Sequence, residues 1–182
     1  QYDRFSKLEF EGEYLKGNKW SGKIFNKNGD VEFELKNGNG KVKEYYYNGK
    51  IKFEGDYLNG EKNGKGKVYD YNGVIEFEGE YLNGERNGKG KEYYHNGILE
   101  FEGDYLEGKR WNGKGYNKFG NIEFEIKNGN GNGKEYDFNG NLEFEGEYLN
   151  GERNGKGKEY DYFDKLKFEG EYLNGERNGK GK

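Results

Sequence analysis

Hydrophobic and polar residues alternate with a period of two along much of the chain. In residues 76–81, Phe77, Gly79 and Tyr81 take every second position and would share one face of a strand, with glutamates on the other face. An Asn-Gly dipeptide follows, and this dipeptide accepts the positive φ angles of a tight turn. Residues 87–93 then return as a second strand. The pattern predicts a β-hairpin.

The first strand of this hairpin recurs as the motif Phe-Glu-Gly-Glu/Asp-Tyr-Leu. A single two-stranded hairpin is marginal in water, so repeats of this kind must stack on their neighbours. We therefore expect an all-β fold, an elongated single-layer array of about eight tandem antiparallel hairpins, nearly free of helix and roughly 80 Å long at about 4.8 Å per strand. The motif starts at Phe10, Phe53, Phe77, Phe101, Phe144 and Phe168, with degenerate copies at Phe33 and Phe124.

The irregular spacing of the repeats itself recurs after 91 residues. Each copy has one tryptophan in its first unit, Trp20 or Trp111, and a shortened second unit. We interpret the chain as one array made of two tandem four-repeat blocks, residues 1–91 and 92–182. The last unit stops within its second strand, and the first residues would continue it in register. We expect this array to be part of a longer one, or copies to associate head to tail.

The aromatic residues of the repeats are expected to line a groove, and the glycines beside them to make room for the rings. Substituting Gly79 by valine should therefore open the array locally. The two tryptophans are either plugs over the shortened neighbouring unit or anchors for a ligand. The candidate binding residues are Phe10, Tyr14, Phe53, Tyr57, Phe77, Tyr81, Phe101, Tyr105, Phe144, Tyr148, Phe168, Tyr172, Trp20 and Trp111. The structural glycines are Gly12, Gly55, Gly79, Gly103, Gly146 and Gly170.

Charge and composition exclude several classes of function. The 31 basic and 35 acidic residues are interspersed, with a net charge of −4, so we expect no nucleic-acid partner and no binding to anionic lipid. Cysteine is absent and His95, in a tyrosine position of the repeat, is the only histidine, which excludes thiolate sites and histidine triads. The compartment stays open, with the cytoplasm favoured.

Carboxylates and glycine-rich stretches also invite catalytic or ligand-binding interpretations. The carboxylates recur in every unit beside lysines, unlike the unique pair of a glycosidase, so a solvated face is expected. Residues 129–134 look like a phosphate loop, but no Ser or Thr follows Lys134, and we expect a shortened hairpin there. The sequence thus predicts no enzyme, no metal and no cofactor.

The spacing Phe77-x-Gly79-x-Tyr81-x-x-Gly84-x-x-Asn87-Gly88-x-Gly90 resembles the membrane occupation and recognition nexus (MORN) repeat. Phenylalanine and tyrosine stand where that repeat has tyrosine and tryptophan, which is similar to divergent bacterial or protist members. Most units here have one extra residue, expected as a bulge in the second strand. The resemblance implies a single-layer hairpin array that binds a peptide or helical tail of another protein, or a second copy of itself.

Two functions are therefore carried forward. The first is a non-catalytic scaffold that mediates protein–protein interaction or self-association through the aromatic groove. The alternative is a carbohydrate-binding or cell-wall-binding module, because residues 45–49 and 92–97 look like the aromatic core of hairpin repeats in choline- and glucan-binding modules. Those modules use paired tryptophans, which this chain lacks.

Overall fold

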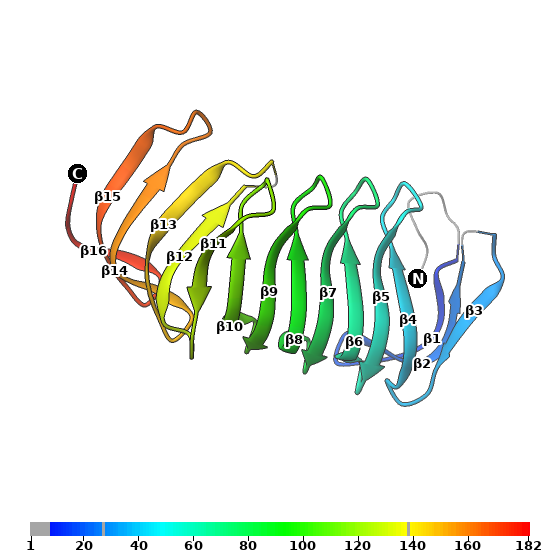
Figure 1. Cartoon of the computed structure of the whole chain (residues 1–182). Helices are drawn as coiled ribbons and strands as arrows, with labels where there is room; N and C mark the ends of the chain where they lie inside the picture. Colours follow the sequence, from blue (N-terminus) through cyan, green and yellow to red (C-terminus); the bar gives the residue numbers. More distant parts are fainter. Residues whose placement is uncertain (1–7, 27, 138) are drawn as a thin grey trace. The chain divides into compact units, whose positions relative to one another are not determined.

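The computed structural model describes residues 8–26, 28–137 and 139–182. Within these ranges the chain forms sixteen β-strands and no helix, which confirms the all-β hairpin array (Figure 1). The described part accordingly has no helix that could cross a membrane. The chain divides into two compact units, residues 1–86 (unit 1) and 87–182 (unit 2). This division falls after residue 86 and the boundary of the sequence blocks after residue 91, so units and sequence blocks differ.

Unit 1 is built from antiparallel neighbours in sequence order. Strands β1, β2 and β3 form a three-stranded sheet, and β4, β5, β6 and β7 follow one another in the next sheet. The strands are β1 (Phe10–Leu15), β2 (Asn18–Phe25), β3 (Val31–Leu35), β4 (Gly40–Tyr45), β5 (Ile51–Leu58), β6 (Glu61–Tyr69) and β7 (Ile75–Leu82).

Unit 2 has the same plan. Strands β8, β9, β10 and β11 are neighbours in sequence order, and β12 to β16 form a five-stranded sheet. The strands are β8 (Glu85–Tyr93), β9 (Leu99–Leu106), β10 (Lys109–Tyr116), β11 (Ile122–Ile126), β12 (Gly131–Tyr136), β13 (Leu142–Leu149), β14 (Glu152–Tyr160), β15 (Leu166–Leu173) and β16 (Glu176–Gly181).

Asn-Gly turns close the hairpins and also connect them. Asn59 and Gly60 between β5 and β6 have φ values of 54° and 84°, the two positive angles of a type I′ turn. The Gly60 amide donates to the Gly38 carbonyl of the preceding turn at 2.9 Å, and the Gly84 amide donates to Lys62 at 2.9 Å. Neighbouring turns and strand ends thus satisfy the backbone groups of the turns.

The second strand of a hairpin carries the expected bulge. Between the pairs Gly55↔Gly66 and Tyr57↔Lys62, β6 has two more residues than β5. Gly64 lies in this bulge with a φ of 83°, a conformation in which glycine has no steric cost. The bulge lets both strands keep their aromatic and glycine positions in register on either side.

The shortened units are short hairpins, as the sequence predicts, but their two strands pair with each other at one position only. Strand β3 pairs with β2 and β4 pairs with β5, and the single bridge Lys36↔Asn39 joins β3 to β4. Lys127↔Asn130 joins β11 to β12 in the same way. Beyond this bridge, each strand of a short unit pairs with its outer neighbour instead. We call these turns the first break (residues 36–39) and the second break (residues 127–130).

The core of each unit lies on the aromatic face of the strands. Phe10, Phe53, Phe77, Phe101 and Phe144 are at most 1% exposed. The Phe53 ring lies against the paired glycines Gly55 and Gly66, where an added Cβ would come within 2.7 Å of a ring carbon. Backbone without side chains therefore forms one wall of the core.

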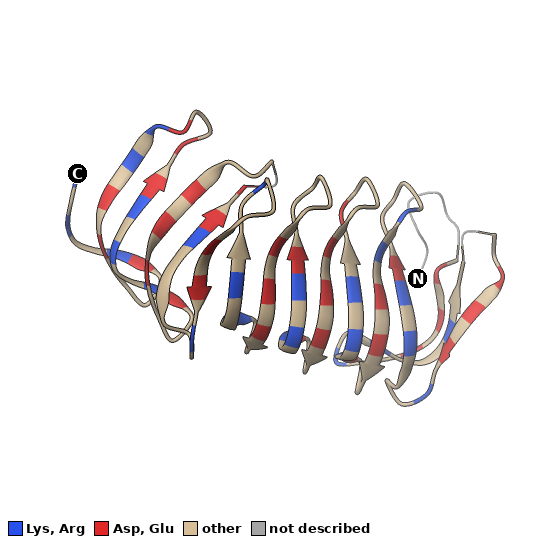
Figure 2. Ribbon diagram, in the orientation of Figure 1, with Lys and Arg blue, Asp and Glu red and all other residues tan. Residues whose placement is uncertain are grey.

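The opposite face carries charge of alternating sign. Figure 2 shows basic bands and acidic bands on successive strands within each unit. In unit 1 Lys67 lies 3.4 Å from Glu78, and in unit 2 Lys91 lies 3.1 Å from Glu102. These side chains are substantially exposed, so each pair contributes little to folding stability.

Candidate binding surfaces

The structure gathers the predicted aromatic residues on one face of each unit but covers most of them. Five of the six repeat phenylalanines are core residues, so the accessible part of the predicted groove consists of tyrosine, tryptophan and Phe168. Tyr14 is 47% exposed. Buried are Phe10, Phe53, Phe77, Phe101, Phe144, Tyr81, Tyr105 and Tyr172; half-buried are Phe168, Tyr57, Tyr148, Trp20 and Trp111.

Basic side chains cover the phenylalanine rings. The Lys62 ammonium lies 4.3 Å from the Phe53 ring centre, and the Arg153 guanidinium lies 4.1 Å from that of Phe144. Each of these rings is therefore held between glycine backbone and a cation. Sequence reasoning missed this role, although a Lys or Arg directly follows Asn-Gly-Glu in four of the repeats. Other such pairs are Arg86 on Phe77, Arg110 on Phe101 and Arg177 on Phe168.

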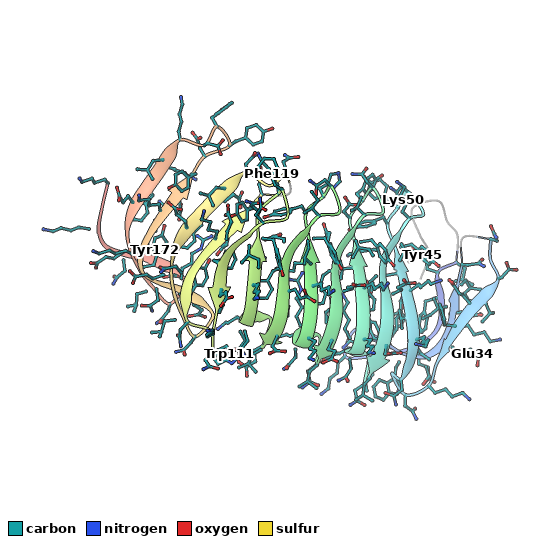
Figure 3. The ribbon with its side chains drawn as sticks, viewed as in Figure 1. Glu34, Tyr45, Lys50, Trp111, Phe119 and Tyr172 are labelled. Carbon is teal, nitrogen blue, oxygen red and sulfur yellow. The ribbon has the colours of Figure 1, made fainter. Side chains whose placement is uncertain are left out.

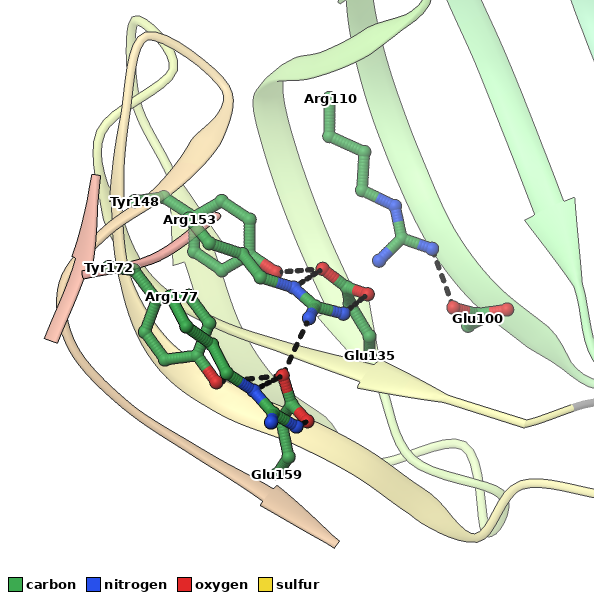
Figure 4. A network of polar contacts seen from close by, with 8 residues as sticks. All are labelled: Glu100, Arg110, Glu135, Tyr148, Arg153, Glu159, Tyr172 and Arg177. Carbon is green, nitrogen blue, oxygen red and sulfur yellow. Dashed lines mark hydrogen bonds and ion pairs between the residues drawn. The ribbon is translucent and has the colours of Figure 1, made fainter. Parts of the chain in front are cut away.

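Glutamates hold these cations in unit 2 (Figure 4). Arg153 donates to both carboxylate oxygens of Glu135, from Nε at 3.0 Å and from Nη2 at 2.5 Å. The Tyr148 hydroxyl also donates to Glu135. One repeat further on, Tyr172 donates to Glu159 at 2.8 Å and Arg177 donates to the same carboxylate. The tyrosines of the predicted groove are thus engaged inside the unit.

The pKa values follow from these contacts. Burial alone would raise the pKa of Glu135, but hydrogen bonds from Arg153 and Tyr148 outweigh it and lower the pKa. Burial and the hydrogen bond to Glu159 raise the pKa of Tyr172 to about 12. The network therefore keeps its carboxylates ionised and its tyrosines neutral, which fits a structural role.

The predicted structural glycines lie where an added side chain meets other atoms. At Gly12, Gly55, Gly103, Gly146 and Gly170 an added Cβ would come within 3.0 Å of backbone or of a phenylalanine ring. The sixth, Gly79, is paired with Gly66 across β7 and β6. This geometry supports the packing role proposed for them.

The two tryptophans lie beside the sheet breaks. The carbonyls of Trp20 and Trp111 accept the amides of Gly38 and Gly129 at 2.5 and 2.8 Å. The Trp111 ring lies over Gly129, where an added Cβ would be 2.7 Å from Cζ3. Figure 3 shows Trp111 at the strand ends opposite to Phe119. This packing favours the interpretation of Trp111 as a plug.

Exposed apolar side chains gather at the turns between repeats. Phe119, Phe163 and Tyr162 are 77%, 75% and 67% exposed, and Tyr47 in unit 1 is 58% exposed. The Tyr47 ring centre lies 5.0 Å from that of Tyr71. Rings exposed to this extent are available for binding.

The charged face of unit 2 has an open hollow of about 1140 Å³. Successive strands contribute the flanking pairs Glu145 and Glu147, Lys156 and Lys158, and Glu169 and Glu171, so the sign of charge alternates from strand to strand. Glycine backbone lies between the two members of each pair. The hollow therefore has a floor without side chains between two rows of mixed charge. In the described residues no group of three or more His, Cys, Asp or Glu is placed to hold a metal.

Comparison with family models identifies the repeats. Residues 53–75, 77–98, 144–162 and 168–182 match the MORN repeat. Residues 38–59 and 129–150, which begin at the two breaks, match the MORN repeat variant. No curated protein matches the chain.

Proposed function

Because the chain belongs to the MORN repeat family, whose repeats are a non-catalytic type that interacts with proteins or membranes, we propose that it is a scaffold that binds a polypeptide partner. The hollow on the charged face of unit 2 supports this proposal best. Its volume of about 1140 Å³ exceeds the usual size of a small-ligand pocket, and its lining changes sign at every strand.

A polypeptide suits such a surface better than an anionic membrane. An anionic lipid surface attracts clustered Lys and Arg. Here, however, strands with carboxylates flank the basic strand β14 on both sides. A chain carrying both signs of charge can match the rows, and electrostatic complementarity of this kind sets specificity and register. We propose that the chain itself carries out no catalysis.

Reversing the charge of one strand tests the proposal. The double variant Lys156→Glu, Lys158→Glu makes the lining from β13, β14 and β15 acidic throughout. The matched control is Lys65→Glu with Lys67→Glu, the same repeat positions on β6 of unit 1, which do not line the hollow. Partners crosslinked to the wild-type chain should be lost with the β14 variant and kept with the β6 variant. Equal loss in both would mean non-specific charge attraction.

Carbohydrate binding remains a second candidate, favoured by the exposed rings of Tyr47 and Phe119. Aromatic faces of this kind can stack on sugar rings. A glycan array tests this candidate: no binding by the wild-type chain would argue against it, and binding that survives Tyr47→Ala and Phe119→Ala would assign it to other residues.

A further inference from the structure

Two rows of side chains flank the hollow on the charged face of unit 2. We call Lys134, Glu145, Lys158 and Glu169 the paired row, and Asn132, Glu147, Lys156 and Glu171 the open row. In the paired row the Lys134 ammonium lies 3.1 Å from a carboxylate oxygen of Glu123, and that of Lys158 lies 3.9 Å from Glu169. For the charged members of the open row, the structure records no ion pair within the residues that it describes. The open row therefore presents its charges to the hollow.

One difference between the units accounts for the open row. In unit 1 the Lys41 ammonium lies 3.0 Å from a carboxylate oxygen of Asp56. At the 91-residue offset the counterparts are Asn132 and Glu147, which lie opposite each other on β12 and β13. Unit 2 thus has an amide where unit 1 has the lysine. The Glu147 carboxylate lies instead against Gly155 in the bulge of β14, and its side chain is exposed.

The spacing of the open row restricts the conformation of a bound chain. Glu147 and Glu171 stand on β13 and β15, two strands apart, which is about 9.6 Å. A polyproline II chain has three residues per turn and rises about 3.1 Å per residue, so every third residue returns to one face after about 9.3 Å. An extended β-strand brings residues to one face every 6.8 Å or about that, which does not match the row. Every third residue of a polyproline II chain can therefore meet the two carboxylates in turn.

The width of the hollow favours the same conformation. The two rows are two residues apart along each strand, about 6.8 Å, with the backbone of Gly146 and Gly157 between them. An α-helix with its side chains is about 10–12 Å wide and would not lie between the rows. A polyproline II chain is a single extended backbone whose carbonyls are not bonded within the chain. Lys156 stands on β14, between the two glutamate-bearing strands, and its ammonium can donate to such a carbonyl.

Given the polypeptide-binding function proposed above, on which this inference rests, we propose that the hollow binds a polyproline II segment of a partner protein with a basic residue at every third position. The bases meet Glu147 and Glu171. The next residue of each triplet turns toward the paired row, where Lys158 favours an acidic side chain. The third residue faces solvent, where proline maintains the conformation.

Three labelled peptides test the spacing by fluorescence anisotropy. The first has four Lys-Glu-Pro triplets and should bind. The second has four Lys-Pro-Glu-Pro units, which place the bases about 12.4 Å apart in the same conformation, and should bind about 10-fold more weakly. The third alternates blocks of four Glu and four Lys, a helix-forming pattern. No binding of the triplet peptide, equal binding of the first two, or tighter binding of the helical peptide would overturn the proposal.

Variants of both units test the residues. Glu147→Gln together with Glu171→Gln should weaken binding of the triplet peptide about 10-fold, as expected for two exposed ion pairs. Asn132→Lys, which gives Glu147 the lysine that Asp56 has in unit 1, should weaken it about 3-fold. The matched control Lys41→Asn removes that lysine from unit 1, away from the hollow, and should leave binding unchanged. Equal effects of Asn132→Lys and Lys41→Asn would overturn the proposal.

Peptide binding and partner crosslinking together separate this site from the general scaffold function. If the triplet peptide does not bind while crosslinked partners still depend on β14, the scaffold function stands and the polyproline II site falls. If the peptide binds through Glu147 and Glu171 while partners are lost equally with the β14 and β6 variants, the site stands and the crosslinked partners are not its ligands.

Discussion

The first and second breaks lie 91 residues apart, but different side chains fill the space around them. Ile24 is buried beside the first break, and its counterpart beside the second is Gly115. The Phe124 ring of unit 2 lies over Gly115, whereas its counterpart Phe33 is only half-buried. An aliphatic side chain in one unit thus replaces an aromatic ring over glycine in the other. Cores accept such exchanges when the filled volume is kept.

The polar side chains beside the two breaks also differ. Arg110 in unit 2 donates to Glu92 at 2.6 Å and to Glu100 at 2.5 Å. Its counterpart in unit 1 is Lys19, whose ammonium lies 5.4 Å from the Phe10 ring centre. A guanidinium can bond two carboxylates at once, and an ammonium has no such fork. Unit 2 therefore holds two carboxylates with one guanidinium beside its break, and unit 1 has a single ammonium at the same position.

Removing the arginine should produce the largest difference between the units. Arg110→Ala leaves Glu92 and Glu100 poorly solvated without their shared cation, and breaking such a pair costs about 3–5 kcal/mol of unfolding free energy. Lys19→Ala should cost less than about 1 kcal/mol, because an ammonium does not bridge two carboxylates as the guanidinium does. Chemical denaturation of both variants measures the difference. Equal losses would show that the arginine network does not stabilise unit 2.

Exchanging the core residues should give the next largest effect. Gly115→Ile copies unit 1 into unit 2, but the Phe124 ring already lies where the new side chain must go. Overpacking of this kind costs about 1–3 kcal/mol. Adding Phe124→Ala should recover part of that loss, so the double variant should be more stable than the sum of the single effects predicts. Strict additivity in denaturation experiments would mean that the two positions do not share this space.

Alkaline pH should weaken the tyrosine contacts of unit 2. Tyr160 and Tyr172 have pKa values raised to about 12, by burial and by hydrogen bonds to glutamate. An unfolded tyrosine ionises near pH 10, so their contribution is fully present below about pH 10 and is lost as the pH rises to about 12. Denaturation midpoints across this range should fall less for Tyr172→Phe than for the wild type. An identical fall in both would exclude Tyr172 as a source of the pH dependence.

The period-two pattern was sufficient to predict the strands and turns but not the breaks. Residues 31–35 and 40–45 alternate like every other strand, and alternation says which face is buried without naming the pairing partner. Which neighbour a strand pairs with depends on the length of both strands and on the units outside them. The shortened segment was visible in the sequence, but its effect on pairing required the three-dimensional structure.

The candidate surfaces were predictable to a similar extent. Aromatic residues on one face followed from spacing, but spacing does not show that Lys62 or Arg153 covers a ring. The recurrence of a basic residue after each Asn-Gly-Glu was an available signal for this cover. The burial of Tyr94, which is 2% exposed, was not predictable, because its ring lies among residues from three later segments, and no local pattern brings these together.

The smallest effect on stability is expected from the exposed ion pairs, and here the two units should differ only in binding. Lys158 lies 3.9 Å from Glu169 in the hollow of unit 2, and Lys67 lies 3.4 Å from Glu78 in unit 1. Exposed pairs contribute about 0–1 kcal/mol, so Lys158→Gln and Lys67→Gln should each change the unfolding free energy by less than about 0.5 kcal/mol.

Only Lys158→Gln should weaken partner binding, because Lys158 lines the hollow and Lys67 does not. Denaturation and a binding titration on the same two variants separate the roles. A stability loss well above about 1 kcal/mol for Lys158→Gln would mean that these rows hold the sheet together, and the hollow would then lose its support as a binding surface.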